Sequence, residues 1–231
     1  MAHHVTQRGN NRQDVFFSAG DRRLYLALLA RHAARHGVQI LGYCLMTNHV
    51  HLVAIPRQAD SLARTLCRTH SEYALEINRC HERSGHLWQS RFYSCSLDSA
   101  HLYEALCYVD LNPVRAGLAG VACEWPWSSA RAHCVEGAVD PVLDREWIGQ
   151  VGGWDHAAWR ECLTAAIPDK RWEAVRRAAY TGEPLGSREF VTVLERQAGR
   201  RLQVLKRGRP RKPEQEAPDS KQACLFAGTD G

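Results

Sequence analysis

Along the first half of the chain, segments in which apolar residues have the two-residue spacing of a strand alternate with segments in which they have helical spacing. The opening stretch HHVTQRG has the loose two-residue alternation of a strand and runs into a loop rich in glycine and asparagine. Apolar residues then recur at helical spacing from Asp21 to His36, which predicts a helix capped by Asp21 and closed by Gly37. Two β-rich runs follow, VQILGYCLM and NHVHLVAIP, and the short Thr47–Asn48 link between them predicts an antiparallel pair.

The same alternation continues to about residue 120. Helical spacing predicts a second helix from Ser61 to Arg83, the run RFYSCSL predicts a strand, and a third helix follows that Asp98 or Ser99 caps and Pro113 ends. The order is therefore strand, helix, strand, strand, helix, strand, helix. This order predicts an α+β fold, a ferredoxin-like antiparallel sheet with helices packed on one face.

The character of the chain changes near Ala122, where tryptophan-rich helical segments broken by prolines and glycines begin. A last helix is predicted from Ser187 to about Gln197, and a polar stretch without the residues of a hydrophobic core ends the chain. We therefore predict a main domain over residues 1–122, a helical C-terminal extension over residues 123–200, and a basic, largely flexible tail over residues 201–231.

The composition of the 231 residues is that of a globular protein, with 45% hydrophobic and 24% charged residues. The N-terminal residues lack the apolar core of a signal peptide, and the longest apolar runs are too short to cross a bilayer. We therefore expect a cytoplasmic protein with no membrane partner. The nine cysteines include no CxxC pair, which argues against a zinc ribbon, a thioredoxin-like motif and a secreted disulfide framework.

Basic residues concentrate in one C-terminal block, although the net charge of the whole chain is only +5. Between Arg196 and Lys212 there are eight basic residues and no acidic one, which is typical of nucleic-acid binding; a merely solvated tail is the alternative. The run KRGRPRK resembles an AT-hook, whose GRP core lies in the minor groove while arginines, here Arg207, Arg209 and Arg211, reach in. Sequence-independent attraction to phosphates would explain the same residues.

His49 and His51 form the sharpest local motif, because residues two apart on a strand project from the same face. Their imidazole nitrogens can bind one metal ion, while Val50 points into the opposite layer. Two histidines are too few ligands for a divalent ion. A pair of solvated or core-edge histidines is the alternative interpretation.

Tyr108 and Asn112 lie four residues apart on the third predicted helix and therefore share a face. If that face packs beside the strand with the two histidines, the Asn112 carbonyl oxygen would complete the metal site and the Tyr108 hydroxyl would face a bound phosphate. A phenol has a pKa of about 10 and is a poor nucleophile at neutral pH, but a metal that polarises the phosphate compensates. Half-buried packing is the alternative role for a helical tyrosine.

Three separated motifs carry a resemblance to a known family. The start HHVTQRGNNRQDVFF, the run YCLMTNHVHLVAIP and the segment LWQSRFYSCSLDSAHLYEALCYVDLNPVRAGL are similar, in this order, to the REP-associated tyrosine transposases, which belong to the HUH superfamily of single-strand DNA transposases. The resemblance covers about residues 3–120. It implies that residues 1–122 are a catalytic domain that cleaves and rejoins single-stranded DNA.

The resemblance also implies roles for individual residues. His49 and His51 match the pair that binds a Mg²⁺ or Mn²⁺ ion, and Asn112 matches a further polar ligand. Tyr108 matches the nucleophile that attacks a DNA phosphodiester, forms a 5′-phosphotyrosine link and frees a 3′-hydroxyl. The implied substrate is a hairpin from repetitive extragenic palindromes (REP) with a short single-stranded guide sequence at its foot.

Two segments are candidates for DNA contact. Arginine and asparagine side chains in the loop after the first strand suit hydrogen bonds to base edges or phosphates, and the strand around Tyr93 mixes charge with aromatic rings, as a base-stacking groove does. A polar turn and alternating strand packing are the respective alternatives. The candidate residues are Arg8, Asn10, Asn11, Arg12, Arg91 and Tyr93.

Three interpretations of the function follow. We expect cleavage and rejoining of single-stranded DNA at REP hairpins; the alternatives are a non-catalytic hairpin-DNA-binding protein and a metal-dependent hydrolase without a covalent intermediate. The lack of a histidine- and aspartate-rich cluster close after His51 argues against the hydrolase. Tyr93 and Tyr103 are competing nucleophiles, but neither has an asparagine four residues on. The chain is expected to be a monomer or a homodimer, with Tyr108 acting in cis or in trans.

Overall fold

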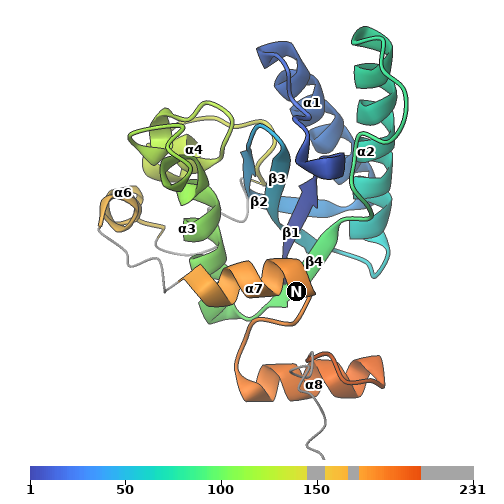
Figure 1. Ribbon diagram of the computed structural model, residues 1–231. Coiled ribbons are helices and arrows are strands. Elements are labelled where there is room, and N and C mark those ends of the chain that lie inside the picture. Colours follow the sequence, from blue (N-terminus) through green and yellow to red (C-terminus); the bar gives the residue numbers. More distant parts are fainter. Residues whose placement is uncertain (145–153, 166–171, 204–231) are drawn as a thin grey trace, which may run out of the picture.

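A four-stranded antiparallel sheet forms the centre of the N-terminal part of the chain (Figure 1). In the computed structural model, which describes residues 1–144, 154–165 and 172–203, its strand order is β2-β3-β1-β4. The β-α-β-β-α-β succession of elements is that of a ferredoxin-like fold, so the predicted α+β fold is confirmed. The strands are β1 (Ala2–Arg8), β2 (Val38–Leu45), β3 (His49–Pro56) and β4 (Tyr93–Leu97).

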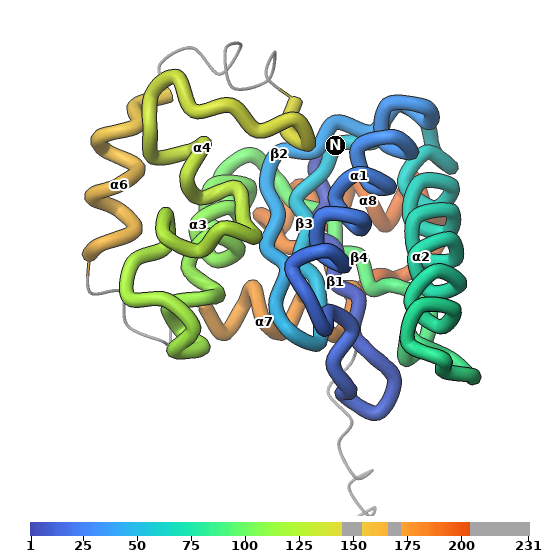
Figure 2. Tube along the Cα trace, turned by 90° about the horizontal axis from the view of Figure 1, so that it is seen from above, coloured from blue at the N-terminus to red at the C-terminus, as the bar shows by residue number. Residues whose placement is uncertain are grey.

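The sheet separates two hydrophobic cores, because successive residues of a strand point to opposite faces. Leu52 belongs to the core under α1 (Ala19–His36) and α2 (Ser61–Cys80), whereas Val53 belongs to the core under α3 (Ser99–Arg115). Figure 2 shows α1 and α2 together on one side of the strands and α3 on the other. The predicted packing of helices on one face therefore holds for α1 and α2, and α3 covers the opposite face.

The N-terminal end of α1 is built by a capping box. The Ser18 side chain accepts a hydrogen bond from the backbone N–H of Asp21 at 3.2 Å, and the Asp21 carboxylate accepts from the backbone N–H groups of Phe17 and Ser18. The prediction that Asp21 is the cap was wrong, because Asp21 acts from the third position of the helix and Ser18 is the N-cap. Gly37 closes the helix with a left-handed φ of 68°, as predicted.

α3 begins as predicted and ends later than predicted. The Asp98 side chain caps the helix by accepting from the backbone N–H of His101 at 2.9 Å. The helix does not end at Pro113; it runs two residues further, and the backbone N–H of Ala116 then bonds to the carbonyl of Asn112 at 3.0 Å. A proline in the last turn removes only one backbone donor, which is why the helix tolerates it there.

α6 and α7 of the C-terminal extension pack on the α3 side of the sheet (Figure 2), whereas Ala132, Val142 and Leu143 join the core under α1 and α2. Trp159, Leu163 and Trp172 belong to the same core as α3, and α7 lies against β1 and β4. Residues 204–231, with the three predicted DNA-binding arginines of the tail, lie outside the described residues. The α-helices of the extension within the described residues are α4 (Ala130–Cys134), α6 (His156–Thr164), α7 (Glu173–Thr181) and α8 (Arg188–Ala198).

Two other helix ends also differ slightly from the pattern. α2 ends at Cys80 rather than at the predicted Arg83, and α8 is shifted by one residue because Ser187 is its N-cap rather than its first residue. No helix within the described ranges combines the length and the apolar character that a membrane crossing requires.

A buried ion pair joins α3 to the extension and to β2. The Asp110 carboxylate lies 2.7 Å from Nδ1 of His133, and it also accepts hydrogen bonds from the Ser129 hydroxyl and from the Trp159 ring N–H. His133 Nε2 faces the carbonyl of Leu41 at 2.9 Å. Since both ring nitrogens of His133 face acceptors, the ring carries two protons. Burial opposes this charge, but the Asp110 carboxylate raises the pKa of His133 above its usual value.

α3 also approaches the sheet closely at one point. β2 has an irregular register between Ile40 and Gly42, and Gly42 has no side chain under the helix. A Cβ atom added there would lie 2.7 Å from Cδ2 of Leu106. Gly42 therefore lets α3 rest directly on the backbone of β2.

Candidate active site

His49 and His51 project from β3 on the α3 side of the sheet. In the sheet register His51 lies opposite Thr6 of β1, and His49 lies opposite Arg8. His51 is buried, with 5% of its surface exposed, whereas His49 is half-buried. Their ring centroids are 5.0 Å apart. The two imidazoles therefore share one face and one end of the strand.

Hydrogen bonds orient both imidazoles through their Nδ1 atoms. His49 Nδ1 lies 2.7 Å from Oδ1 of Asn48, whose orientation is set because its Nδ2 donates to the Arg12 carbonyl at 3.0 Å. An amide oxygen only accepts, so His49 Nδ1 carries the proton and Nε2 keeps its lone pair. His51 Nδ1 lies 3.0 Å from Nε2 of His4. In each ring Nε2 is the nitrogen that remains for a ligand.

Burial keeps these imidazoles neutral. Burial, with a smaller contribution from Arg8, lowers the pKa of His49 to about 4. Burial and the neighbouring rings of His49 and His4 lower the pKa of His51 well below its usual value. Burial alone lowers the pKa of His4 to about 4. Neutral imidazole is the form that binds metal ions.

Tyr108 of α3 lies over the same histidines. Its ring centroid is 5.7 Å from that of His51 and 5.9 Å from that of His4. Only 6% of Tyr108 is exposed, and burial raises the pKa of its phenol, while Arg115 works in the opposite direction. The Arg115 guanidinium carbon lies 4.9 Å from the centre of the Tyr108 ring. The structure thus brings the predicted nucleophile and the predicted histidine pair together within one chain.

Asn112 is less directly connected to this group. It is buried one turn after Tyr108, and its amide nitrogen donates to the Tyr108 backbone carbonyl at 3.0 Å. Asn112 is not among the residues that line the cavity described below, so its role as a metal ligand stays a prediction. Within the described ranges no group of three or more His, Cys, Asp or Glu side chains is placed to hold a metal ion. The two neutral imidazoles fit a divalent ion as two of its ligands.

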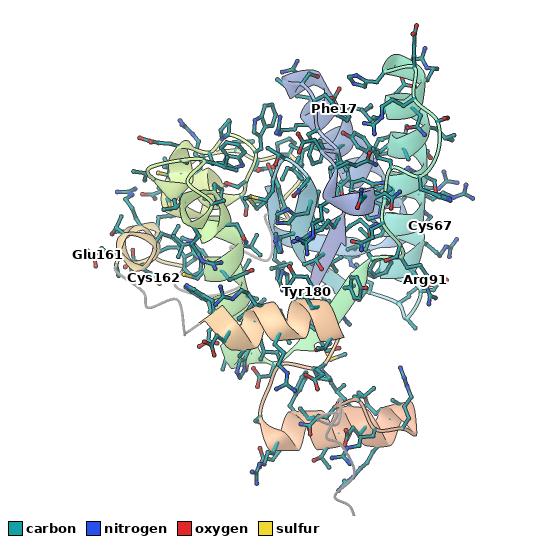
Figure 3. The ribbon with its side chains drawn as sticks, viewed as in Figure 1. Phe17, Cys67, Arg91, Glu161, Cys162 and Tyr180 are labelled. Atoms are coloured by element: carbon teal, nitrogen blue, oxygen red, sulfur yellow. The ribbon has the colours of Figure 1, made fainter. Side chains whose placement is uncertain are left out.

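A cavity of about 210 Å³ opens over the histidines. Three of the residues predicted to contact DNA line it together with the predicted catalytic residues. α7 of the extension forms one of its walls (Figure 3). The lining residues are Thr6, Gln7, Arg8, Arg12, His49, His51, Gln89, Tyr93, Tyr108, Ala179 and Tyr180.

The other predicted DNA-contact residues lie outside this cavity. Asn10 and Asn11 are exposed in a 3-10 turn over Asn10–Arg12, where Asn11 has a positive φ of 50°. Arg91 is exposed and lines a separate, larger cavity along α2 (Figure 3). Arg8, Arg12 and Tyr93 therefore line the cavity over the histidines, whereas Asn10, Asn11 and Arg91 do not.

His4 and Tyr180 are among the residues of the site that the sequence-based prediction did not include. His4 is fully buried and is the hydrogen-bond partner of His51. Tyr180 lines the cavity from α7, although it follows Tyr108 by 72 positions in the chain. Most side chains of β1 are polar, so no local pattern marks His4 as the buried partner of His51. No local signal marks Tyr180, because its position depends on how the extension packs.

Comparison with known proteins identifies the class of this domain. Residues 1–112 match the model of the family "Transposase IS200 like". The segment contains His49, His51 and Tyr108. Residues 1–112 are therefore similar to this transposase family.

The resemblance to the REP-associated tyrosine transposases is confirmed by a relative and by a solved structure. A Haemophilus influenzae protein assigned to these transposases is 26% identical over a segment that covers 39% of this chain and 58% of the relative. The match thus spans little more than half of that relative. A REP-associated tyrosine transposase bound to a REP hairpin superposes with a TM-score of 0.51 and 14% identity, over 62% of this chain and 84% of that chain. This structural likeness concerns the fold.

A second solved structure matches more weakly. A protein from Deinococcus radiodurans assigned as a transposase superposes with a TM-score of 0.37 and 15% identity, over 48% of this chain and 88% of that chain. A TM-score of this size carries no argument about the fold.

Proposed function

We propose that this protein is a metal-dependent single-strand DNA endonuclease and strand transferase that acts on REP hairpins through a 5′-phosphotyrosine intermediate. The observation that carries the proposal is the approach of the Tyr108 ring to within 5.7 Å of the His51 ring, beside His49 and inside one cavity. All three residues come from one chain. Tyr108 is accordingly proposed to act in cis, in a monomer or in each subunit of a homodimer.

In the proposed reaction the Tyr108 oxygen attacks the phosphorus of a phosphodiester. The new bond joins phosphorus to the tyrosine oxygen, and the bond from phosphorus to the 3′-oxygen breaks. The phenol proton leaves to solvent, and the leaving 3′-oxygen takes up a proton as a free hydroxyl. Attack by another 3′-hydroxyl on the phosphotyrosine reverses the step and joins two strands.

The residues around Tyr108 would support this chemistry in different ways. Arg115, stacked on the phenol, stabilises the negative charge of the deprotonated oxygen that burial disfavours. His49 and His51 would hold a Mg²⁺ or Mn²⁺ ion through Nε2, with Asn112 as a further candidate ligand. A bound ion of this kind polarises the scissile phosphate.

The basic and aromatic residues of the cavity wall suit single-stranded DNA. Arg8 and Arg12 supply positive charge for the backbone, and Tyr93 supplies a ring for a base. The REP hairpin as substrate is proposed from the relative and from the hairpin-bound structure with the same fold. The tail arginines Arg207 and Arg209 are proposed to bind the duplex stem or its phosphates.

Incubation of the protein with Mn²⁺ and a labelled REP hairpin that carries single-stranded DNA at its foot tests the proposal. We expect a covalent protein–DNA adduct on a denaturing gel, and we expect Tyr108→Phe to abolish it, because Tyr108 is the tyrosine whose ring contacts His51. Tyr103→Phe is the matched control, since Tyr103 lies on the same helix and is stacked on Trp154 outside the cavity.

The two alternative functions give different outcomes in this experiment. Cleaved DNA without an adduct would identify a metal-dependent hydrolase. Tight binding of the hairpin without any cleavage, by the wild type and by Tyr108→Phe alike, would identify a non-catalytic DNA-binding protein. Either result overturns the proposed transferase.

A further inference from the structure

α7 of the extension and the loop after β1 both line the cavity. The Thr6 hydroxyl of β1 donates a hydrogen bond to the carbonyl of Ala179 at 3.2 Å, which fastens the end of α7 to the strand that runs beside β3. Ala179 and Tyr180 consequently line the same cavity as His49 and Tyr108. Figure 3 places Tyr180 on the side of α7 that faces the sheet.

The Tyr180 ring is held in place but remains accessible. Arg8 donates a hydrogen bond from its guanidinium to the Tyr180 hydroxyl at 3.0 Å, and its guanidinium carbon lies 5.7 Å from the ring centre. The residue nevertheless has 59% of its surface exposed. A large aromatic ring that is oriented by a hydrogen bond and left open at the mouth of a cavity is suited to contact a ligand.

Tyr93 presents a second open ring to the same cavity. It lies opposite Thr6 in the register of β4 with β1, on the face that carries the histidines, and 47% of its surface is exposed. Arg8 and Arg12 add positive charge to the lining of this cavity. Open aromatic rings combined with arginines are the features with which proteins bind single-stranded nucleic acid, because bases stack on the rings and phosphates approach the charges.

We infer that Tyr180 stacks against the nucleobase adjacent to the phosphate that Tyr108 attacks. The inference rests on the proposed function, and it assigns to the C-terminal extension a part in holding the substrate. The cavity is small, so a nucleotide that contacts Tyr180 must be a near neighbour of the phosphate held at His49 and His51. Tyr108 remains the proposed nucleophile rather than Tyr180, because Tyr108 is the tyrosine in contact with His51.

Binding without chemistry tests the inference. A Tyr108→Phe protein in EDTA is titrated with a fluorescent REP hairpin that carries a single-stranded foot, and Tyr180→Ala, Tyr180→Phe and Tyr180→Trp are added to this background. We expect Tyr180→Ala to weaken binding about 5- to 150-fold, the range for loss of one stacking ring. Tyr180→Trp and Tyr180→Phe keep a ring and should stay within about threefold of the parent.

Abasic substitutions show which nucleotide is involved. In a series of hairpins with one abasic position each in the single-stranded foot, one position next to the cleavage site should weaken binding to the Tyr180-containing parent. The same position should have no further effect in Tyr180→Ala, because the ring that the base contacts is already missing. Tyr103→Ala is the control, since it removes a partly exposed tyrosine outside the cavity.

The outcomes separate this inference from the proposed function. If Tyr180→Ala binds as tightly as its parent, or if every abasic effect persists in Tyr180→Ala, the stacking role is overturned while the transferase proposal stands. If Tyr180→Ala and Tyr180→Trp lose binding equally, Tyr180 acts only in packing α7, and the inference is again overturned. Failure of the wild type to form an adduct, with Tyr180-dependent binding intact, contradicts the transferase proposal alone.

Discussion

Two groups of buried histidines contact α3, one on each side of the helix, and they differ in charge. Tyr108 contacts His4 and His51, which burial keeps neutral. Asp110, two residues later, contacts His133, whose two ring nitrogens both face acceptors. Both environments are buried, so burial alone does not decide the charge of a histidine. A carboxylate within hydrogen-bond distance decides it, and only the Asp110 side has one.

We expect the Asp110–His133 pair to have a structural role and the rings of His49 and His51 to have a chemical one. The charged pair of Asp110 and His133 uses all its hydrogen-bonding atoms inside the protein and connects α3 with β2, α4 and α6. The neutral rings of His49 and His51 keep Nε2 for a ligand. We therefore expect mutations on the Asp110 side to change stability and mutations on the Tyr108 side to change activity.

The largest expected effect is on stability. Asp110→Ala should lower the free energy of unfolding by about 3–5 kcal/mol, because it leaves His133 buried without its carboxylate and removes the acceptor of Ser129 and Trp159. Urea denaturation followed by circular dichroism measures this change. His49→Ala serves as the comparison and should change stability by less than about 1 kcal/mol. Equal stability of Asp110→Ala and the wild type would refute the structural role.

The next effect concerns the rate of adduct formation. His49→Ala should slow it by more than about 100-fold while the protein stays folded, since even the outer partners of metal ligands are worth about 10–100-fold. The rate is measured with Mn²⁺ and the labelled hairpin on denaturing gels. An unchanged rate in His49→Ala would show that the proposed metal site lies elsewhere.

A smaller effect is expected at the hydrogen bond behind His51. His4→Phe should lower the affinity for Mn²⁺ by about tenfold, because Nδ1 of His51 loses the partner that orients the ring. Titration of Mn²⁺ followed by electron paramagnetic resonance measures this affinity. His4→Gln offers an amide oxygen to the same nitrogen and should restore part of it. Equal affinity in all three proteins would mean that His4 only fills space.

The smallest effect is the pH dependence of the ion pair. Because the folded-state pKa of His133 is raised above 6.5, its contribution to stability is fully present below pH 6.5 and is lost as the pH rises through the folded-state value. The stability difference between the wild type and His133→Gln should therefore shrink as the pH is raised from 6 to 10. A difference that grows over this range would show that His133 is neutral in the folded protein.

Local sequence patterns predicted most of the fold, since strand alternation and helical spacing depend on neighbouring residues. They also predicted that His49 and His51 share a face. They could not tell which face of the sheet α3 covers, because an amphipathic helix fits either side. Ser18 was missed as a cap because Asp21, which completes the same capping box, is also a residue type found at caps.

The rest of the candidate site depends on contacts between distant segments. His4 meets His51 only because β1 pairs with β3 in one register, and a shift by one residue would turn His4 to the other face. Tyr180 meets the cavity only because the core of the extension docks α7 on β1. Contacts between such distant segments are not reflected in the local spacing of apolar and polar residues, so the sequence pattern does not predict them.

The lack of a Cβ atom at Gly42 affects how closely the helix that carries Tyr108 packs on the sheet. Gly42 allows α3 and the Asp110–His133 pair to pack directly against the backbone of β2. A methyl group at position 42 would lie close to Leu106, Ser129 and His133. Such a group would displace the end of the Leu106 side chain and crowd His133 and Ser129 without altering any reactive group. Alanine at position 42 therefore tests how closely α3 and β2 must pack for the reaction.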